Sequence, residues 1–137
     1  MTLSAQLSID ALKGGNIHVV GLSGAEGIAT VEFLWKHGIT TITAHDYVRK
    51  EDFAKSFRLY HLGLSSLERK EKLDFVKYLE LKTHFHDAYL QGIEEAEIIF
   101  ASCGWFKHSA NFPRLKTAHD KGVPFHNTIQ LYLEYCT

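Results

Sequence analysis

The chain has 137 residues, which fits one domain with a hydrophobic core of its own. Lys and Arg total 15 against 16 Asp and Glu, so no overall basic field is present to hold nucleic acid or an anionic membrane. Two cysteines do not make a disulfide framework, and no apolar run approaches the roughly 20 residues of a membrane span, so we expect a soluble, cytoplasmic protein.

The first part of the chain alternates between strand and helix patterns. A short helix or ordered arm is expected within residues 4–13, and a buried strand over 17–20. Residues 24–37 have apolar positions at a helical period that ends at Gly38, and 39–44 is a β-branched run ending in His45 and Asp46. These lengths predict two parallel strands joined by a right-handed crossover.

The segment 50–82 is rich in charge and carries apolar residues at helical spacing. It predicts two helices, the first ended by Gly63 and the second begun by a capping box from Ser65 to Glu68. A third strand is expected within 79–85. The expected elements after it are a helix over 87–96, a strand over 97–102, a helix from Pro113 to Gly122, a strand over 123–126 and a last helix capped by 127–130.

This alternation predicts a single Rossmann-like α/β domain over residues 1–137. It is an open parallel five-stranded sheet with helices on both faces and a helical insertion around residues 50–82. Ligands of such sheets bind at the carboxyl ends of the strands. Three corners of the sequence should meet there: the turn at Gly21, the corner at 45–46 and the corner at 102–104.

The turn after the first strand contains glycines at positions 21, 24 and 27, in the spacing G-x-x-G-x-x-G. Glycines allow positive φ and close backbone approach, so amides at the start of the following helix can face an anion. The pattern indicates a phosphate-binding turn for a nucleotide diphosphate. The alternative is a tight strand-to-helix connection that binds no ligand.

Three stretches, in this order, resemble the N-terminal domain of the Mur ligase family, and the D-glutamate-adding ligases in particular. The first is VVGLSGAEG over 19–27, and the second is TAHD over 43–46. The third is AEIIFASCG over 96–104, followed by FPRL at 112–115, AHDKGVPF at 118–125 and TIQLY at 128–132. The resemblance covers most of the chain.

The resemblance implies a Rossmann-like domain that holds the UDP moiety of UDP-N-acetylmuramoyl-L-alanine during peptidoglycan precursor synthesis. In that family ATP and Mg²⁺ belong to a central domain with a P-loop, and this sequence contains no G-x-x-x-x-G-K-[ST] run. The chain is therefore expected to carry no cofactor and to be catalytically silent alone. Its expected partner is a UDP-sugar nucleotide.

The resemblance also implies a set of ligand-contacting residues. Main-chain amides of 22–27 would meet the diphosphate, Asp46 and its neighbour Tyr47 would face the uridine, and 102–104 would line the uracil pocket. The full implied set is Gly21, Leu22, Ser23, Gly24, Ala25, Glu26, Gly27, Asp46, Tyr47, Ser102, Cys103 and Gly104.

Two features of the sequence depart from the family's pattern. Glu26 places a negative charge in the turn, and at about 4 Å from a phosphate oxygen the repulsion costs on the order of 1 to 4 kcal/mol. The alternative is that Glu26 points away as a first-turn acid that favours the helix N-terminus. Cys103 replaces a proline, and the adjacent Trp105 and Phe106 are expected to lie in the core or partly in it.

Two other classes of function remain open. Asp46 suits the ribose of NAD as well as uridine, so an NAD(P)-binding oxidoreductase fragment is one alternative. The other is a stand-alone interaction protein with a degenerate nucleotide site, which docks a protein partner on the helices of 50–82.

Histidine and cysteine patterns favour structural roles over chemistry. His84 and His86 would lie on one side of a strand, but no partner at metal-ligand spacing follows beyond Asp87, so no metal site is expected. His45 at a strand end is expected on the surface. Cys103 is expected to pack and not to act as a nucleophile.

Overall fold

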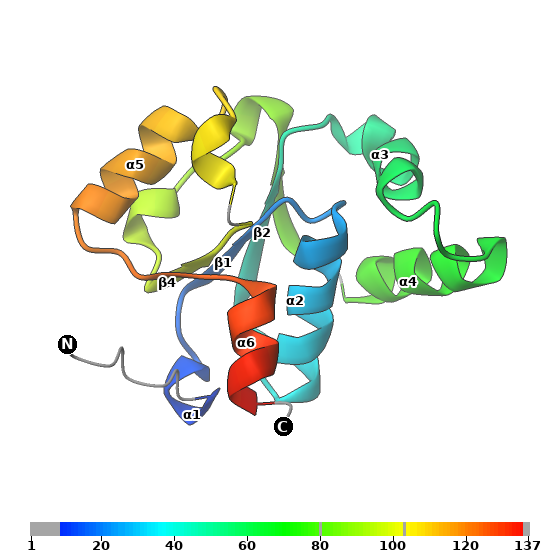
Figure 1. Ribbon diagram of the computed structural model, residues 1–137, viewed down its shortest axis with the longest axis horizontal. Coiled ribbons are helices and arrows are strands. Elements are labelled where there is room, and N and C mark those ends of the chain that lie inside the picture. Colours follow the sequence, from blue (N-terminus) through cyan, green and yellow to red (C-terminus); the bar gives the residue numbers. More distant parts are fainter. Residues whose placement is uncertain (1–8, 80, 103, 136–137) are drawn as a thin grey trace.

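The computed structural model describes residues 9–79, 81–102 and 104–135. Its strands form one sheet in the order β3-β2-β1-β4-β5, and every neighbouring pair is parallel (Figure 1). The strands are β1 (Ile17–Val20), β2 (Ile42–Asp46), β3 (Lys82–Phe85), β4 (Ile98–Phe100) and β5 (Phe125–His126). The predicted Rossmann-like α/β class and its parallel five-stranded sheet are confirmed.

The order of the strands reverses between β1 and β4. The chain moves from β1 to β2 and β3 toward one edge, and then returns to place β4 on the other side of β1. Ile17 of β1 therefore pairs with Ile42 of β2 on one side and with Ile98 of β4 on the other. This reversal makes the carboxyl ends of β1 and β4 the position where a ligand of such a sheet is expected.

Helices cover both faces of the sheet. The α-helices are α1 (Ile9–Leu12), α2 (Ala25–Lys36), α3 (Phe53–Tyr60), α4 (Ser66–Tyr78), α5 (Phe112–Asp120) and α6 (Thr128–Tyr135). In Figure 1, α5 lies on one side of the sheet, and α2, α6, α3 and α4 lie on the other. No helix in the described part of the chain has both the length and the apolar character needed to cross a membrane.

Two buried clusters follow from this layering. The first core lies under α2 and α6 and includes Ile17, Val19, Ile42, Ala44, Ile98 and Phe100 of the sheet. The second core lies under α5 and includes Leu90, Ile93, Ile99, Leu115 and Ala118. Alternate residues of each strand serve opposite faces, as a sheet covered on both sides requires.

The insertion over 50–82 forms the two helices that the sequence predicts, preceded by a 3₁₀ turn, η1 (Lys50–Asp52). The Ser65 hydroxyl accepts from the Glu68 amide at 3.1 Å, and the Glu68 carboxylate accepts from the Ser65 amide at 3.2 Å, which completes the predicted capping box. Phe57 of α3 and Val76 of α4 are buried in the first core, and burial of a phenylalanine side chain contributes roughly 2 to 3 kcal/mol. The insertion is therefore packed against the sheet.

Two predicted elements are wrong in part. The second strand begins at Ile42 and not at 39, because Gly38 has φ +79° and the Ile39 amide returns to the Leu34 carbonyl to close α2. Residues 87–96 form no α-helix. They contain the short 3₁₀ turns η2 (His86–Ala88) and η3 (Ile93–Glu95), because Leu90 at φ +64° and Gly92 at φ +76° break the helical path.

The remaining elements agree in kind with the sequence but are shorter. β4 and β5 occupy only part of the predicted ranges 97–102 and 123–126, and α1 occupies part of 4–13, of which 4–8 lies outside the described residues. The predicted cap of α6 is present, since the Asn127 side chain accepts from the Gln130 amide at 2.9 Å. The predicted boundaries of α5 also hold, because Pro113 lies in its first turn and Gly122 follows it at φ +92°.

Candidate functional site

The glycine turn brings the start of α2 against the end of β1. Gly21 has φ +86°, a conformation that favours glycine. A Cβ on Gly27 would lie 2.0 Å from the Gly21 carbonyl oxygen, so no side chain fits there. A Cβ on Gly24 would lie 3.3 Å from the same oxygen. The spacing of the three glycines is therefore explained by close contact between helix and strand end.

The main-chain amides of this turn divide into two groups. The Gly21 and Leu22 amides donate to the His45 carbonyl at 2.8 and 3.2 Å, and the Gly24 amide donates to the Gly21 carbonyl at 3.0 Å. The amides of residues 25–27, in the first turn of α2, have no hydrogen-bond partner within the described ranges. Three donors backed by the helix dipole are thus left for an anion.

Asp46, at the end of β2, is tied to the turn. Its side chain is 3% exposed and accepts from the Ser23 amide at 2.7 Å and from the Val48 amide at 3.2 Å. The carboxylate therefore joins the first two corners that the sequence analysis expected to meet. Its neighbour Tyr47 is exposed, and its ring lies 5.6 Å from the ring of Tyr89.

Ser23 is buried and faces the insertion. Its hydroxyl is hydrogen-bonded to the Ser56 hydroxyl of α3 at 2.9 Å. Leu22 beside it is a member of the first core. The packing of Leu22 and the hydrogen bond of Ser23 fix the position of the turn, and α3 contacts the turn through Ser56.

Glu26 lies between the carboxyl ends of β1 and β4. Its Oε2 atom is buried and has no hydrogen-bond partner among the residues that the structure describes. It lines a cavity of about 10 Å³ together with Ser102, Asn127 and Thr128. A space of this size holds about one water molecule, so a diphosphate fits only if the Glu26 side chain rotates away.

The third corner is more open. Ser102 is exposed, and a Cβ on Gly104 would meet nothing within 4 Å, while Cys103 lies outside the described residues. The 3₁₀ turn η4 (Trp105–Lys107) follows. Trp105 stacks on Phe125 with ring centres 5.2 Å apart and packs on the second core, as expected. The expectation that Phe106 is also in the core is wrong, because this side chain is 52% exposed.

A row of three histidines crosses the sheet on the face covered by α5. His18 of β1, His45 of β2 and His84 of β3 stack in sequence, with ring centres 4.9 and 5.2 Å apart. His45 is fully buried, so the expectation that it lies on the surface is wrong. The signal that could have revealed the row is positional, since in the observed register these strand positions share one face.

Hydrogen bonds assign the tautomers of two of these histidines. The Leu90 amide donates to His45 Nδ1 at 3.1 Å, so a neutral His45 carries its proton on Nε2. That proton is donated to His18 Nδ1 at 2.7 Å, and the His18 Nε2 proton is donated to the Asn16 side-chain oxygen at 3.1 Å. The result is one directional chain of hydrogen bonds.

Both imidazoles in this chain are neutral at pH 7. Burial, together with His84 and Lys82, lowers the pKa of His18 to about 4. Burial, followed by the neighbouring His18 and His84 and by Arg114 and Lys82, lowers the pKa of His45 to about 3. The protein therefore holds two bases in its interior that strongly resist protonation.

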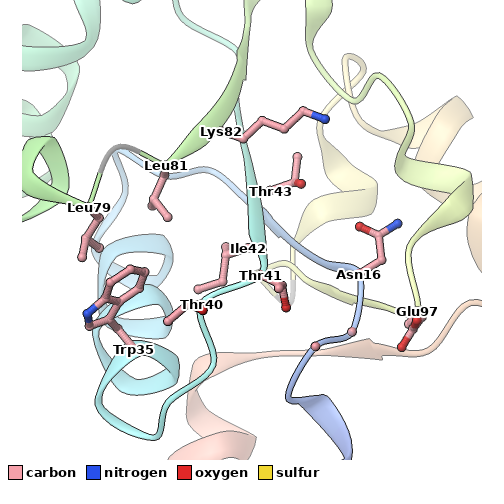
Figure 2. A pocket seen from close by; sticks show the side chains of 12 residues that line it. Asn16, Trp35, Thr40, Thr41, Ile42, Thr43, Leu79, Leu81, Lys82 and Glu97 are labelled. Carbon is pink, nitrogen blue, oxygen red and sulfur yellow. The ribbon is translucent and has the colours of Figure 1, made fainter.

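A larger cavity opens at the opposite edge of the sheet, at the amino ends of its strands. It has a volume of about 530 Å³. Figure 2 shows the apolar side chains of Trp35, Leu79 and Leu81 on one side and the polar Asn16 and Glu97 on the other. The glycine turn does not line this cavity. Because ligands of parallel sheets bind at the carboxyl ends of the strands, its size alone does not make it the nucleotide site.

The sheet order and the glycine turn together define an α/β domain of the Rossmann-like type. No protein-family model matches the chain, and no significant match is found among curated proteins. Within residues 9–79, 81–102 and 104–135, no three His, Cys, Asp or Glu side chains are grouped to hold a metal ion.

Proposed function

We propose that this domain binds the UDP moiety of UDP-N-acetylmuramoyl-L-alanine, as the N-terminal domain of a Mur-type, D-glutamate-adding ligase of cytoplasmic peptidoglycan synthesis. The observation that carries the proposal is the contact of Gly27 with the Gly21 carbonyl. This contact holds the unpaired first-turn amides of α2 at the reversal point of the sheet. Such amides, backed by a helix dipole, supply the chemistry that a diphosphate needs.

Each group at the site has a role in this proposal. The amides of 25–27 bind the diphosphate, and the uracil lies beside residues 102–104. Asp46 accepts a hydrogen bond from the uridine in exchange for one of the two backbone amides that it now holds. The domain positions the nucleotide, and the ATP and Mg²⁺ of the parent ligase belong to other domains.

Glu26 sets the affinity in this proposal. Its side chain lines the small cavity at the end of β1, and in this proposal it turns away before a phosphate enters. Charge repulsion at about 4 Å costs on the order of 1 to 4 kcal/mol, which corresponds to about 5-fold to 1,000-fold in affinity. Glu26→Gln removes the charge at nearly the same volume, and Glu26→Ala removes both charge and bulk.

Isothermal titration of UDP-N-acetylmuramoyl-L-alanine, UDP and NADH into the three proteins tests the proposal. We expect heat from both uridine ligands and tighter binding to both variants than to the wild type. Glu71→Gln, an exposed acid on α4, is the control for the change in net charge and is expected to bind as the wild type does. Heat from NADH alone would reject the uridine proposal in favour of an NAD(P)-binding domain.

A second function is favoured by the anions already present at the site. The Asp46 carboxylate accepts from the Ser23 amide, and the Glu26 side chain lines the small cavity beside the first turn of α2, as in a nucleotide site that has been closed by the protein's own side chains. In this case the domain is an interaction module that docks a protein on the insertion. Five apolar or aromatic side chains of that segment are more than 60% exposed, namely Leu59, Tyr60, Leu62, Leu67 and Tyr78.

The same titrations separate the two functions. If none of the ligands binds to the wild type or to either Glu26 variant, the interaction function is favoured. A partner that co-purifies with the wild type should then be lost from the double variant Leu59→Ser, Leu62→Ser. Leu133→Ser, which changes an exposed leucine on α6, is the matched control and should retain the partner.

A further inference from the structure

The connection from β3 to β4, residues 86–97, lies over the sheet without an α-helix of its own. Its backbone turns through three residues with positive φ, His86, Leu90 and Gly92, and its short 3₁₀ turns satisfy only part of its amides. Leu90 is 1% exposed, and its amide donates to the side chain of His45. The imidazole of His45 thus gives the middle of this connection a polar anchor, in addition to the burial of Leu90 and Ile93 in the second core.

That anchor depends on the protonation state of His45. The Nδ1 atom can accept from the Leu90 amide at 3.1 Å only while it carries no proton. A second proton on the imidazole would go to Nδ1, since Nε2 already donates to His18. Two N–H groups would then face each other across the same short distance, and the attraction would become repulsion.

The groups packed around His45 provide no counter-charge for a protonated ring. His18 faces it from β1, and His84 and Lys82 from β3. Tyr89 of the connection meets its ring edge-on, and Arg114 acts on it from α5, where that guanidinium is already paired with Glu94.

The nearest acid along the chain, Asp46, does not neutralise the positive charge of a protonated His45 either. Asp46, the next residue on β2, belongs to the opposite face of the strand and is held by the Ser23 and Val48 amides. Protonation of His45 in the closed structure therefore adds a positive charge beside the cations Lys82 and Arg114 and the neutral rings. Opening of the connection over 86–97 relieves this charge repulsion.

We propose that His45 is an acid-sensitive latch: its neutral form holds residues 86–93 against the sheet, and its protonation releases this segment while the first core stays folded. This device is separate from the proposed nucleotide function, because it uses the side chain of His45, whereas the Gly21 and Leu22 amides of the glycine turn donate to the His45 carbonyl. The first core, which packs on the other face, contains none of the three stacked histidines.

A second buried histidine, His61, serves as an internal control for the role of His45. His61 is 7% exposed, and its Nδ1 atom donates to the Phe57 carbonyl at 2.7 Å. A carbonyl only accepts, so Nδ1 already carries a proton there and a second one goes to Nε2 without breaking the bond. Both histidines are buried, but only His45 holds the backbone through a bond that protonation destroys.

Peptide-resolved hydrogen–deuterium exchange at pH 7.5 and pH 5.0, expressed as protection factors, tests the latch. If His45 regains its ordinary pKa near 6.5 on opening, the opening constant rises by about 30-fold at pH 5.0. We expect protection of 86–93 to fall by about that factor and to stay well below that of peptides covering β1 and α2 at both pH values, because these exchange only by global unfolding. Equal protection factors for 86–93, β1 and α2 at pH 5.0 overturn the proposal, because equal values report global unfolding.

Two variants sharpen the test. His45→Asn places an amide oxygen near the former Nδ1 position and removes the titration, so the pH dependence of protection at 86–93 should largely vanish. His61→Asn should keep the 30-fold dependence. A full dependence in folded His45→Asn overturns the latch. If His45→Asn does not fold, the wild-type comparison between segments decides the question, since unchanged protection of 86–93 at pH 5.0 also overturns it.

Discussion

The contact between Gly27 and Gly21 predicts a graded series of glycine substitutions. In Gly27→Ala the new Cβ would lie 2.0 Å from the Gly21 carbonyl oxygen and 2.7 Å from its carbonyl carbon. Cβ contacts below 3.0 Å are essentially never seen, so the start of α2 must move by at least about 1 Å away from the end of β1. The obstacle is backbone, which cannot rotate away as a flexible side chain can.

We expect Gly27→Ala to lower the free energy of unfolding by about 3 kcal/mol or more, at the upper end of the range for overpacking in a buried region. For a domain of this size that corresponds to a fall in melting temperature of roughly 10 °C. Gly24→Ala, whose Cβ lies 3.3 Å from the same oxygen, should cost about 1 kcal/mol or less. Gly63→Ala meets nothing within 4 Å and should change stability by under about 1 kcal/mol.

Urea unfolding followed by circular dichroism measures all three variants against the wild type. The reasoning requires the order Gly27, Gly24, Gly63 from most to least destabilised. A Gly27→Ala protein as stable as Gly63→Ala would refute it, because the close packing of α2 on β1 would then not exist as described.

Three further predictions concern stability. The folded state holds His18 and His45 neutral, whereas the same side chains of the unfolded chain bind protons below pH 6.5. The free energy of unfolding should therefore fall by about 1.4 kcal/mol per pH unit for each histidine between pH 6.5 and pH 4. Equal stability at pH 7 and pH 5 in urea titrations would contradict this. Asp46→Asn should lower the free energy of unfolding by about 2 kcal/mol at pH 7, because a side-chain amide cannot accept from both the Ser23 and the Val48 amides as the carboxylate does. Thermal unfolding measures this loss of stability, and Asp87→Asn, which changes an exposed acid, is the control. Ser65→Ala removes the cap of α4 and should cost about 1 kcal/mol in the same thermal assay, with Ser66→Ala in the first turn of that helix expected to change little.

The fold class and most of the elements could be predicted because local signals agree with the tertiary structure. β-branched runs mark the strands, and Ser65, Pro113 and Gly122 mark helix ends by mechanisms that act within a few residues. Residues 87–96 failed because Leu90, a residue that rarely adopts positive φ, does so here, where its side chain is buried and its amide is held by His45. A long-range contact thus overrides the local preference for a helix.

The candidate site was predictable in position but not in occupancy. The spacing of glycines places the turn at the end of β1, and the structure agrees. The sequence cannot show that Asp46 turns back onto the Ser23 amide, or that Glu26 Oε2 is buried without a partner among the described residues. The histidine row was missed because its members are 27 and 39 positions apart along the chain and meet only through the register of three strands.

The hydrogen bond between the Ser23 and Ser56 hydroxyls joins the glycine turn to α3. Any free-energy coupling that this bond carries between a nucleotide at the first turn of α2 and a protein on α3, the two ligands of the proposals above, must be reciprocal. Each ligand would then change the affinity of the other by the same factor.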